Sequence, residues 1–340
     1  MLYKYLTFNV ISDKVLTMDD IKTEEVVTKK KNVSFSQYSN WYNCRHRWYL
    51  DNVKGLKRFE DSINTCFGTA IHEAVQLYIE TLYTKGAPQA SEHDLPVIFK
   101  DAFKRELDKA KENSNKVKNP DAEKPVETTP FDYTPEQFAE FLVDGDNILE
   151  AFLNQTNRLK YFPSGKYEFV SVEDEIIMPI KHNVQFICYI DIVLKEKSTG
   201  RYRIIDIKTS TQAWNKYQME NPSKTSQVLL YKAFFSRKYN VPIDMIDVEF
   251  FILKRKLYEN YAFPQSRVQS FVPTNNQKAV AGVLNTFSEF ITESFKPDGS
   301  FIDEPKGYLK NPGKAKKNCK YCPHKKVSCD AKSDIPKDEE

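Results

Sequence analysis

Two short apolar segments on either side of one turn constrain the fold of this chain more than any other feature. Residues 189–194 and 202–209 are rich in isoleucine, valine and tyrosine, and the turn between them, residues 196–200, contains Ser198, Thr199 and Gly200. Runs of β-branched residues separated by such a turn are typical of a β-hairpin. We therefore expect two paired antiparallel strands here.

Three charged side chains of this expected hairpin can meet at one point. Side chains alternate across a strand, so Asp206 and Lys208 share a face, and the neighbouring strand can present Asp191 beside them. A charge inside an apolar strand is costly unless something binds it. Two carboxylates and an amine at one point suit a Mg²⁺ site with an ammonium near the attacking water. The hairpin therefore predicts a catalytic metal site.

Two further motifs flank the hairpin in the sequence. Gly68 and His72 open a run with helical spacing of apolar residues. Downstream, Gln227 and Tyr231 stand one helical turn apart. Together with Asp191 and the segment 206–208, these motifs resemble in their order the PD-(D/E)XK nuclease superfamily, and specifically its RecB-like branch. The resemblance implies an α/β fold with a restriction-endonuclease-like αβββαβ core and helical insertions.

The resemblance also implies roles for individual residues. A Mg²⁺ or Mn²⁺ ion would be held by His72, Asp191, Asp206 and the carbonyl of Ile207. The catalytic positions would be Asp191, Asp206, Lys208, Gln227 and Tyr231. Glu173 is a further acidic candidate, but its neighbours Asp174 and Glu175 compete for that role.

The cysteines indicate a second site. The chain has six cysteines, and its N-terminal run has no sustained apolar core that would mark a secretory signal, so disulfides are not the default interpretation. Cys319, Cys322 and Cys329 have the spacing of a metal site. Three thiolates need a fourth ligand.

The same family resemblance supplies the fourth cysteine. In RecB-like nucleases with an iron-sulfur cluster, one upstream cysteine joins three near the C-terminus, and Cys44 follows the Ser-x-Ser lead-in of that motif at Ser34. The resemblance therefore implies a [4Fe-4S] cluster on Cys44, Cys319, Cys322 and Cys329. Structural Zn²⁺ is the alternative, because four cysteines bind zinc as well. Arg45 stands where the family usually has proline, and the last spacing is one residue longer than usual. Cys66 and Cys188 are interpreted as core residues.

Positive charge is concentrated in residues 309–332, near the end of the sequence. The formal net charge is only +3, yet residues 309–332 carry eight lysines and one acidic residue, a local net charge of +7. Lysines neutralise phosphates and aromatic rings such as Trp48 stack on unpaired bases, so this mixture suits single-stranded DNA. No run of eighteen apolar residues predicts a membrane span, and we expect an intracellular, cytoplasmic protein with no membrane partner.

The pattern of segments predicts the domain organisation. We expect an N-terminal extension at 1–33 and a nuclease domain at 34–330, followed by a disordered acidic tail at 331–340. Within the nuclease domain, we expect a helical insertion at about 84–160, a catalytic core at about 165–256 and a cluster-binding tail at about 309–330. A polar break at about 112–130 precedes a helix that Thr134, Pro135 and Gln137 would cap.

These observations together predict a metal-dependent deoxyribonuclease. Family analogy favours an exonuclease that acts on DNA ends or single strands in recombination, repair or replication. One alternative is a nuclease subunit that is active only with a helicase or another recombination partner, since the chain has no Walker-type phosphate loop of its own. The other is a catalytically silent DNA-binding module.

Overall fold

The structure is a computed structural model, and it describes residues 30–57, 61–114, 131–325 and 327–334. The expected N-terminal extension up to residue 29, most of the polar break and the last six residues lie outside this part. No helix in the described ranges has the length and apolar character needed to cross a membrane.

A six-stranded sheet forms the centre of the molecule. Its strands are β1 (Lys31–Val33), β2 (Tyr167–Pro179), β3 (Val184–Glu196), β4 (Tyr202–Ser210), β5 (Ile246–Lys254) and β6 (Val268–Phe271). Strand β3 pairs with β2 and β4 in antiparallel fashion, and β4 pairs with β5 in parallel. The parallel pair is joined by helix α9 (Pro222–Tyr239), as a crossover connection requires.

The hairpin expected from the sequence is the β3–β4 pair. Ile192 pairs with Ile205 and Lys195 with Tyr202, and the Gly200 N–H donates to the Glu196 carbonyl to close the turn. Gly200 has a φ of 70°, a conformation that glycine adopts without steric cost. The predicted hairpin is therefore confirmed.

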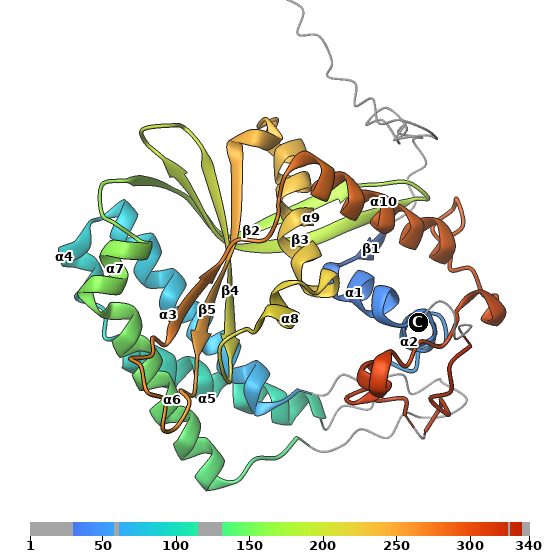
Figure 1. The fold of residues 1–340 in the computed structure, drawn as a ribbon, viewed down its shortest axis with the longest axis horizontal. Helices are drawn as coiled ribbons and strands as arrows, with labels where there is room; N and C mark the ends of the chain where they lie inside the picture. The colour runs from blue at the N-terminus through green and yellow to red at the C-terminus, as the bar shows by residue number, and fades with distance from the viewer. Residues whose placement is uncertain (1–29, 58–60, 115–130, 326, 335–340) are drawn as a thin grey trace, which may run out of the picture.

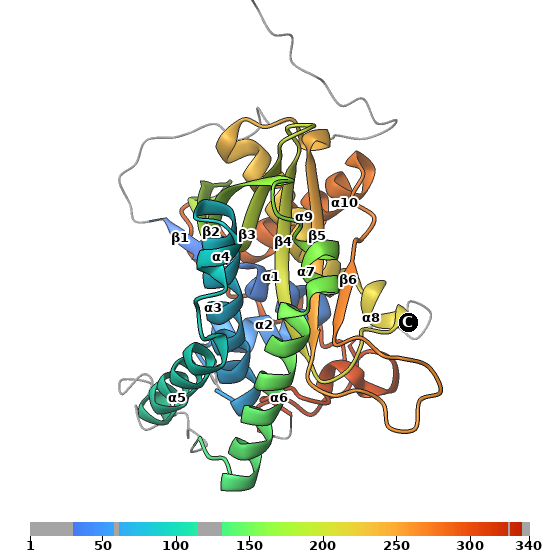
Figure 2. The same cartoon turned by 90° about the vertical axis from the view of Figure 1, so that its left-hand side faces the viewer.

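Helices cover both faces of the sheet (Figures 1 and 2). One face packs against α3 (Ile63–Thr84), α5 (Leu95–Ser114), α6 (Pro135–Leu153) and α7 (Gln155–Tyr161), and the other against α1 (Phe35–Asn43), α2 (Arg45–Asn52), α9 and α10 (Gln277–Ser294). Short elements complete the described fold: α4 (Ala87–Ala90), α8 (Lys216–Met219), η2 (Ile243–Met245), η3 (Pro305–Gly307) and η4 (Lys314–Cys319).

The order α3, β2, β3, β4, α9, β5 matches the predicted αβββαβ core. Helix α6 starts as predicted, because the Thr134 and Gln137 side chains cap each other's backbone N–H groups. One segment differs from expectation. Lys31–Val33 was placed in the N-terminal extension, but it pairs in parallel with Val184–Phe186 of β3 and so belongs to the sheet.

Candidate active site and cysteine site

Asp191, Asp206 and Lys208 of the hairpin converge, as the alternation of side chains along the strands predicts. The Lys208 Nζ lies 2.7 Å from the Asp206 Oδ2, and Asp206 is 1% exposed. Asp191, which is also buried, accepts a 2.6 Å hydrogen bond from the Ile207 backbone N–H. Strand β4 thus supplies an ion pair whose carboxylate is buried, and β3 supplies a second carboxylate that is bonded to the same stretch of backbone.

Helix α3 brings His72 to these carboxylates. The His72 Nδ1 lies 3.6 Å from the Asp191 Oδ2. His72, Glu173 and Asp191 each offer one ligand atom, and these three atoms all lie within 4.8 Å of one another. Imidazole and carboxylate groups at this spacing form a donor set for a divalent cation.

Among three adjacent acidic residues, the structure places Glu173 in this group. Glu173 has a φ of 48° within β2, a left-handed conformation that is rare for a non-glycine residue in a strand. Asp174 instead accepts hydrogen bonds from Lys238 and Tyr239 at the end of α9, and Glu175 accepts one from Tyr189. The unusual backbone conformation at Glu173 coincides with the point where its carboxylate joins the site.

Gln76 is a residue that the sequence analysis missed. It lies one helical turn after His72 on α3 and is buried. Its Nε2 donates to the Glu173 Oε1 at 2.6 Å and to the Asp191 carbonyl at 3.1 Å. The spacing of four residues from His72 was the available signal, because positions four apart share a helix face.

Burial sets the protonation of the site. It raises the pKa of Asp191 to about 7 and that of Asp206 to about 6, although the Lys208 ammonium opposes both shifts. Burial and Lys208 together lower the pKa of His72 to about 4. Burial alone would lower the pKa of Lys208, but Asp206 and Asp191 outweigh it and raise that pKa. Near neutral pH, a neutral imidazole and a lysine ammonium therefore stand beside carboxyl groups that are ready to lose protons to a cation.

Gln227 and Tyr231 approach the same site from α9. The Gln227 Nε2 donates to the Tyr231 hydroxyl at 2.7 Å, and Tyr231 is buried. Burial raises the pKa of Tyr231, and the charge of Asp206 adds to the effect. The structure therefore brings this predicted pair to the carboxylates of the hairpin.

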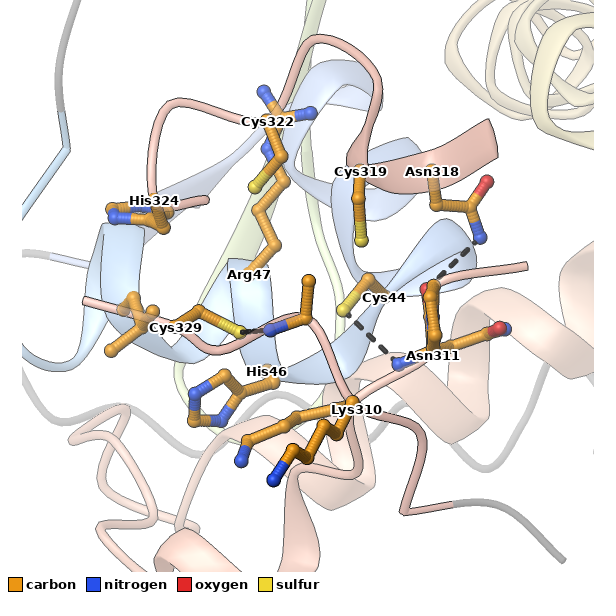
Figure 3. Close-up of a pocket in the computed structure, with 14 residues that line it drawn as sticks. Cys44, His46, Arg47, Lys310, Asn311, Asn318, Cys319, Cys322, His324 and Cys329 are labelled. Carbon is orange, nitrogen blue, oxygen red and sulfur yellow. Dashed lines mark hydrogen bonds between the residues drawn. The ribbon is translucent and has the colours of Figure 1, made fainter. Parts of the chain in front are cut away.

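The four cysteines predicted to act together line one pocket, although Cys44 is far from the others in sequence. Figure 3 shows their sulfur atoms turned toward a common space, with Cys44 on one side and Cys319, Cys322 and Cys329 around it. Cys66 and Cys188 lie in the hydrophobic cores, as predicted.

Backbone N–H groups and neighbouring thiols surround the sulfur atoms of this pocket. The backbone N–H of Asn311 donates to the Cys44 Sγ, and that of Ala331 donates to the Cys329 Sγ, each at 3.4 Å. Burial raises the pKa of Cys319, and Cys322 and the other two thiols of the pocket raise it further. If all four cysteines lose their protons, a bound metal ion or cluster would balance the charge of the thiolates.

Two helices at the start of the described chain hold the tail that carries three of these cysteines. The buried His324 ring bonds Asp51 of α2 at 2.8 Å, and the Asn318 side chain donates to the Asn43 carbonyl at 2.9 Å. The Trp48 ring stacks on Tyr308, with ring centroids 5.7 Å apart. Figure 1 shows the tail, in red, beside α2.

Comparison with known proteins gives one family. The model of the PD-(D/E)XK nuclease superfamily matches residues 32–330. No match was found among curated proteins.

Proposed function

We propose that this chain, which belongs to the PD-(D/E)XK nuclease superfamily, is a metal-dependent deoxyribonuclease whose reaction takes place around Asp191, Asp206 and Lys208. The observation that carries the proposal is the convergence of these three residues with His72 and Glu173 in one group, in which Asp191 and Asp206 are buried and Glu173 is exposed. The retention of charged groups on buried strands argues against a catalytically silent module, because such charges cost stability unless they are used.

The donor set fits Mg²⁺ or Mn²⁺. Asp191, Asp206 and Glu173 offer hard oxygen ligands, and His72 adds a nitrogen that suits Mn²⁺. The Ile207 carbonyl remains a proposed ligand. When bound, the ion supplies Lewis-acid stabilisation of the phosphate and lowers the pKa of its water.

The protein groups have separate tasks in this proposal. Lys208 keeps its proton beside Asp206, so its ammonium orients the attacking water and balances charge that develops on the phosphate. Gln76 fixes the Glu173 carboxylate, and neutral His72 offers a lone pair. Gln227, held by Tyr231, positions the substrate strand.

The substrate proposed is DNA with a free end or a single strand. Family analogy and the local concentration of lysines at residues 309–332 support it. An exonuclease in recombination, repair or replication is the leading role. The RecB-like assignment rests on the His72, Gln227 and Tyr231 motifs together with the cysteines.

The test is cleavage by the isolated chain with Mg²⁺ or Mn²⁺ on end-labelled linear DNA and on circular DNA. Asp206→Ala and Lys208→Ala should abolish cleavage, while Lys197→Ala, at the opposite end of the hairpin, should not. Cleavage of linear DNA alone supports an exonuclease. Binding without cleavage by the wild type in either metal would contradict an autonomous nuclease, and recovery of cleavage with a helicase would favour the subunit alternative. Wild-type rates in either active-site variant would refute the proposed site.

We also propose that Cys44, Cys319, Cys322 and Cys329 hold a [4Fe-4S] cluster. The four thiols line one pocket, and one of them comes from far upstream of the other three, as in the iron-sulfur nucleases that the sequence resembles. Structural Zn²⁺ is the alternative, because four cysteines bind zinc as well. The task of the cluster would be structural, because it joins α1 and α2 to the tail.

Protein purified without oxygen tests this assignment. It should absorb broadly in the visible range and contain about four irons per chain. Cys44→Ser should lose the iron and the colour, whereas Cys66→Ser should keep both, because Cys66 bonds the Glu106 carbonyl outside the pocket. About one zinc and no iron would assign the site to zinc, and full iron in Cys44→Ser would exclude Cys44 as a ligand.

A further inference from the structure

Two lysines from different parts of the chain are held against one short segment beside the candidate active site. The Lys224 Nζ, on the first turn of α9, lies 4.6 Å from the centroid of the Trp214 ring. The Lys317 Nζ, on η4 of the tail, lies 3.0 Å from the centroid of the Tyr217 ring on α8. Cation–π contacts of this kind fix the position of an amine without neutralising its charge.

Neither amine has an acidic partner among the residues that the structure describes. Ion pairs occupy many lysines in the described ranges, but no carboxylate there lies within 4.0 Å of the Lys224 or Lys317 amine. Burial lowers the pKa of Lys224, and the charges of Lys208 and Lys317 lower it further. Trp214 and Tyr217 lie three residues apart in sequence, so the two amines that contact their rings lie near each other. The charge of Lys208 acts on Lys224 as well.

Like charges that gather with too few counterions form a site for anions. The Lys208 amine on β4 pairs with Asp206, whereas the amines of Lys224 on α9 and Lys317 on η4 have no carboxylate partner in the described ranges. The three amines lead from the candidate active site toward the cysteine-bearing tail. Tyr217 is 58% exposed and Lys317 is exposed, so this part of the surface is open to a ligand. A chain of phosphates is the ligand that matches several separate cations in sequence.

We propose that Lys224 and Lys317 continue from Lys208 as a phosphate-binding track, which holds the phosphodiester groups next to the scissile phosphate on the side of the tail. The track rests on the proposed nuclease function and names a part of its substrate site. It gives the cysteine-bearing tail a direct contact with the substrate, in addition to its packing against α1 and α2.

Salt dependence of DNA binding tests the track. The probe is a fluorescently labelled single-stranded oligonucleotide, and its anisotropy is measured without divalent metal over a series of salt concentrations. Lys224→Gln and Lys317→Gln should each weaken binding about two- to fivefold and reduce the slope of log affinity against log salt by about 0.7, the value for one phosphate on a single strand. Lys317→Arg should keep the wild-type slope.

The matched control is Lys197→Gln. Lys197 is exposed on the turn at the far end of the β3–β4 hairpin, so its removal changes the net charge equally without touching the track. If Lys224→Gln and Lys317→Gln change the affinity and the salt slope no more than Lys197→Gln does, the track is refuted. Since Lys224 lies on α9, its variant tests the track even where Lys317→Gln disturbs the tail.

The same experiments separate this inference from the proposed function. Wild-type cleavage that depends on Asp206, combined with unchanged slopes in both track variants, would refute the track and leave the nuclease assignment in place. A wild type that neither binds nor cleaves DNA would refute the nuclease function itself. Reduced slopes in the track variants, with iron content and melting temperature unchanged, would support the track.

Discussion

Replacement of Asp191 by asparagine should stabilise the metal-free protein while it removes activity. Asp191 is 9% exposed, and burial raises its pKa to about 7. Asparagine has the same shape, and its carbonyl oxygen can still accept the hydrogen bond from the Ile207 N–H. The substitution therefore removes the cost of a buried charge without opening a cavity.

The pKa of Asp191 sets the size and the sign of this effect. The unfolded carboxyl group has a pKa of about 3.9, so the folded protein retains a proton between about pH 4 and pH 7 that the unfolded chain has lost. Stability therefore falls as the pH rises through this window. The difference between the two pKa values corresponds to a destabilisation of at most about 4 kcal/mol above pH 7 and of about 1 kcal/mol at pH 4.5.

Thermal melting in the presence of a chelator measures the difference. With an unfolding entropy of about 2 cal/mol/K per residue, 4 kcal/mol corresponds to about 6 °C in this 340-residue chain. Asp191→Asn should melt above the wild type at pH 8, and the gap should narrow toward pH 4.5. Mn²⁺ should then raise the melting temperature of the wild type more than that of the variant. A variant that melts at or below the wild type at pH 8 would refute the reasoning.

Two further changes test other parts of the structure. Gln76→Leu removes the side-chain N–H that donates to the Glu173 carboxylate. The affinity for Mn²⁺, measured by calorimetric titration, should fall about 10- to 100-fold. An unchanged affinity would show that this hydrogen bond does not support the metal site. Gly145→Ala places a Cβ against the Phe99 ring and should lower the free energy of unfolding in urea by about 1–3 kcal/mol. Gly282→Ala on α10 meets nothing within 4 Å and should raise that free energy by about 0.5–1 kcal/mol. Equal changes in the two variants would contradict the packing around Gly145.

The strands and helices of the core could be predicted because they depend on local patterns. Alternation along β4 places Asp206 and Lys208 on one face, and the capping residues Thr134 and Gln137 mark the start of α6. The short β3–β4 turn brings Asp191 beside residues 206–208 of the next strand. These parts of the candidate site follow from neighbours in sequence.

The remainder depends on contacts between distant segments. Glu173 joins the site through a left-handed backbone conformation that no sequence pattern predicts. Gln76 contacts Glu173 from a different element, helix α3. Strand β1 pairs with β3 across about 150 residues, which the charged sequence before it did not indicate. The proximity of Lys224 to Lys317 likewise depends on where the tail returns to the core.

The contacts of the tail determine what loss of the cysteine site would change. The buried bond between His324 and Asp51, and the stacking of Trp48 on Tyr308, fasten the tail to α2 without any metal. Asp206 and Lys208 lie on the central sheet, where their positions do not depend on the tail. Lys317 does depend on it, since it lies two residues before Cys319. If both the cluster and the phosphate track are correct, removal of the cluster weakens DNA binding through Lys317 and leaves Asp206 and Lys208 in place. Loss of the cluster should therefore lower the affinity for DNA before it lowers the cleavage rate at saturating DNA.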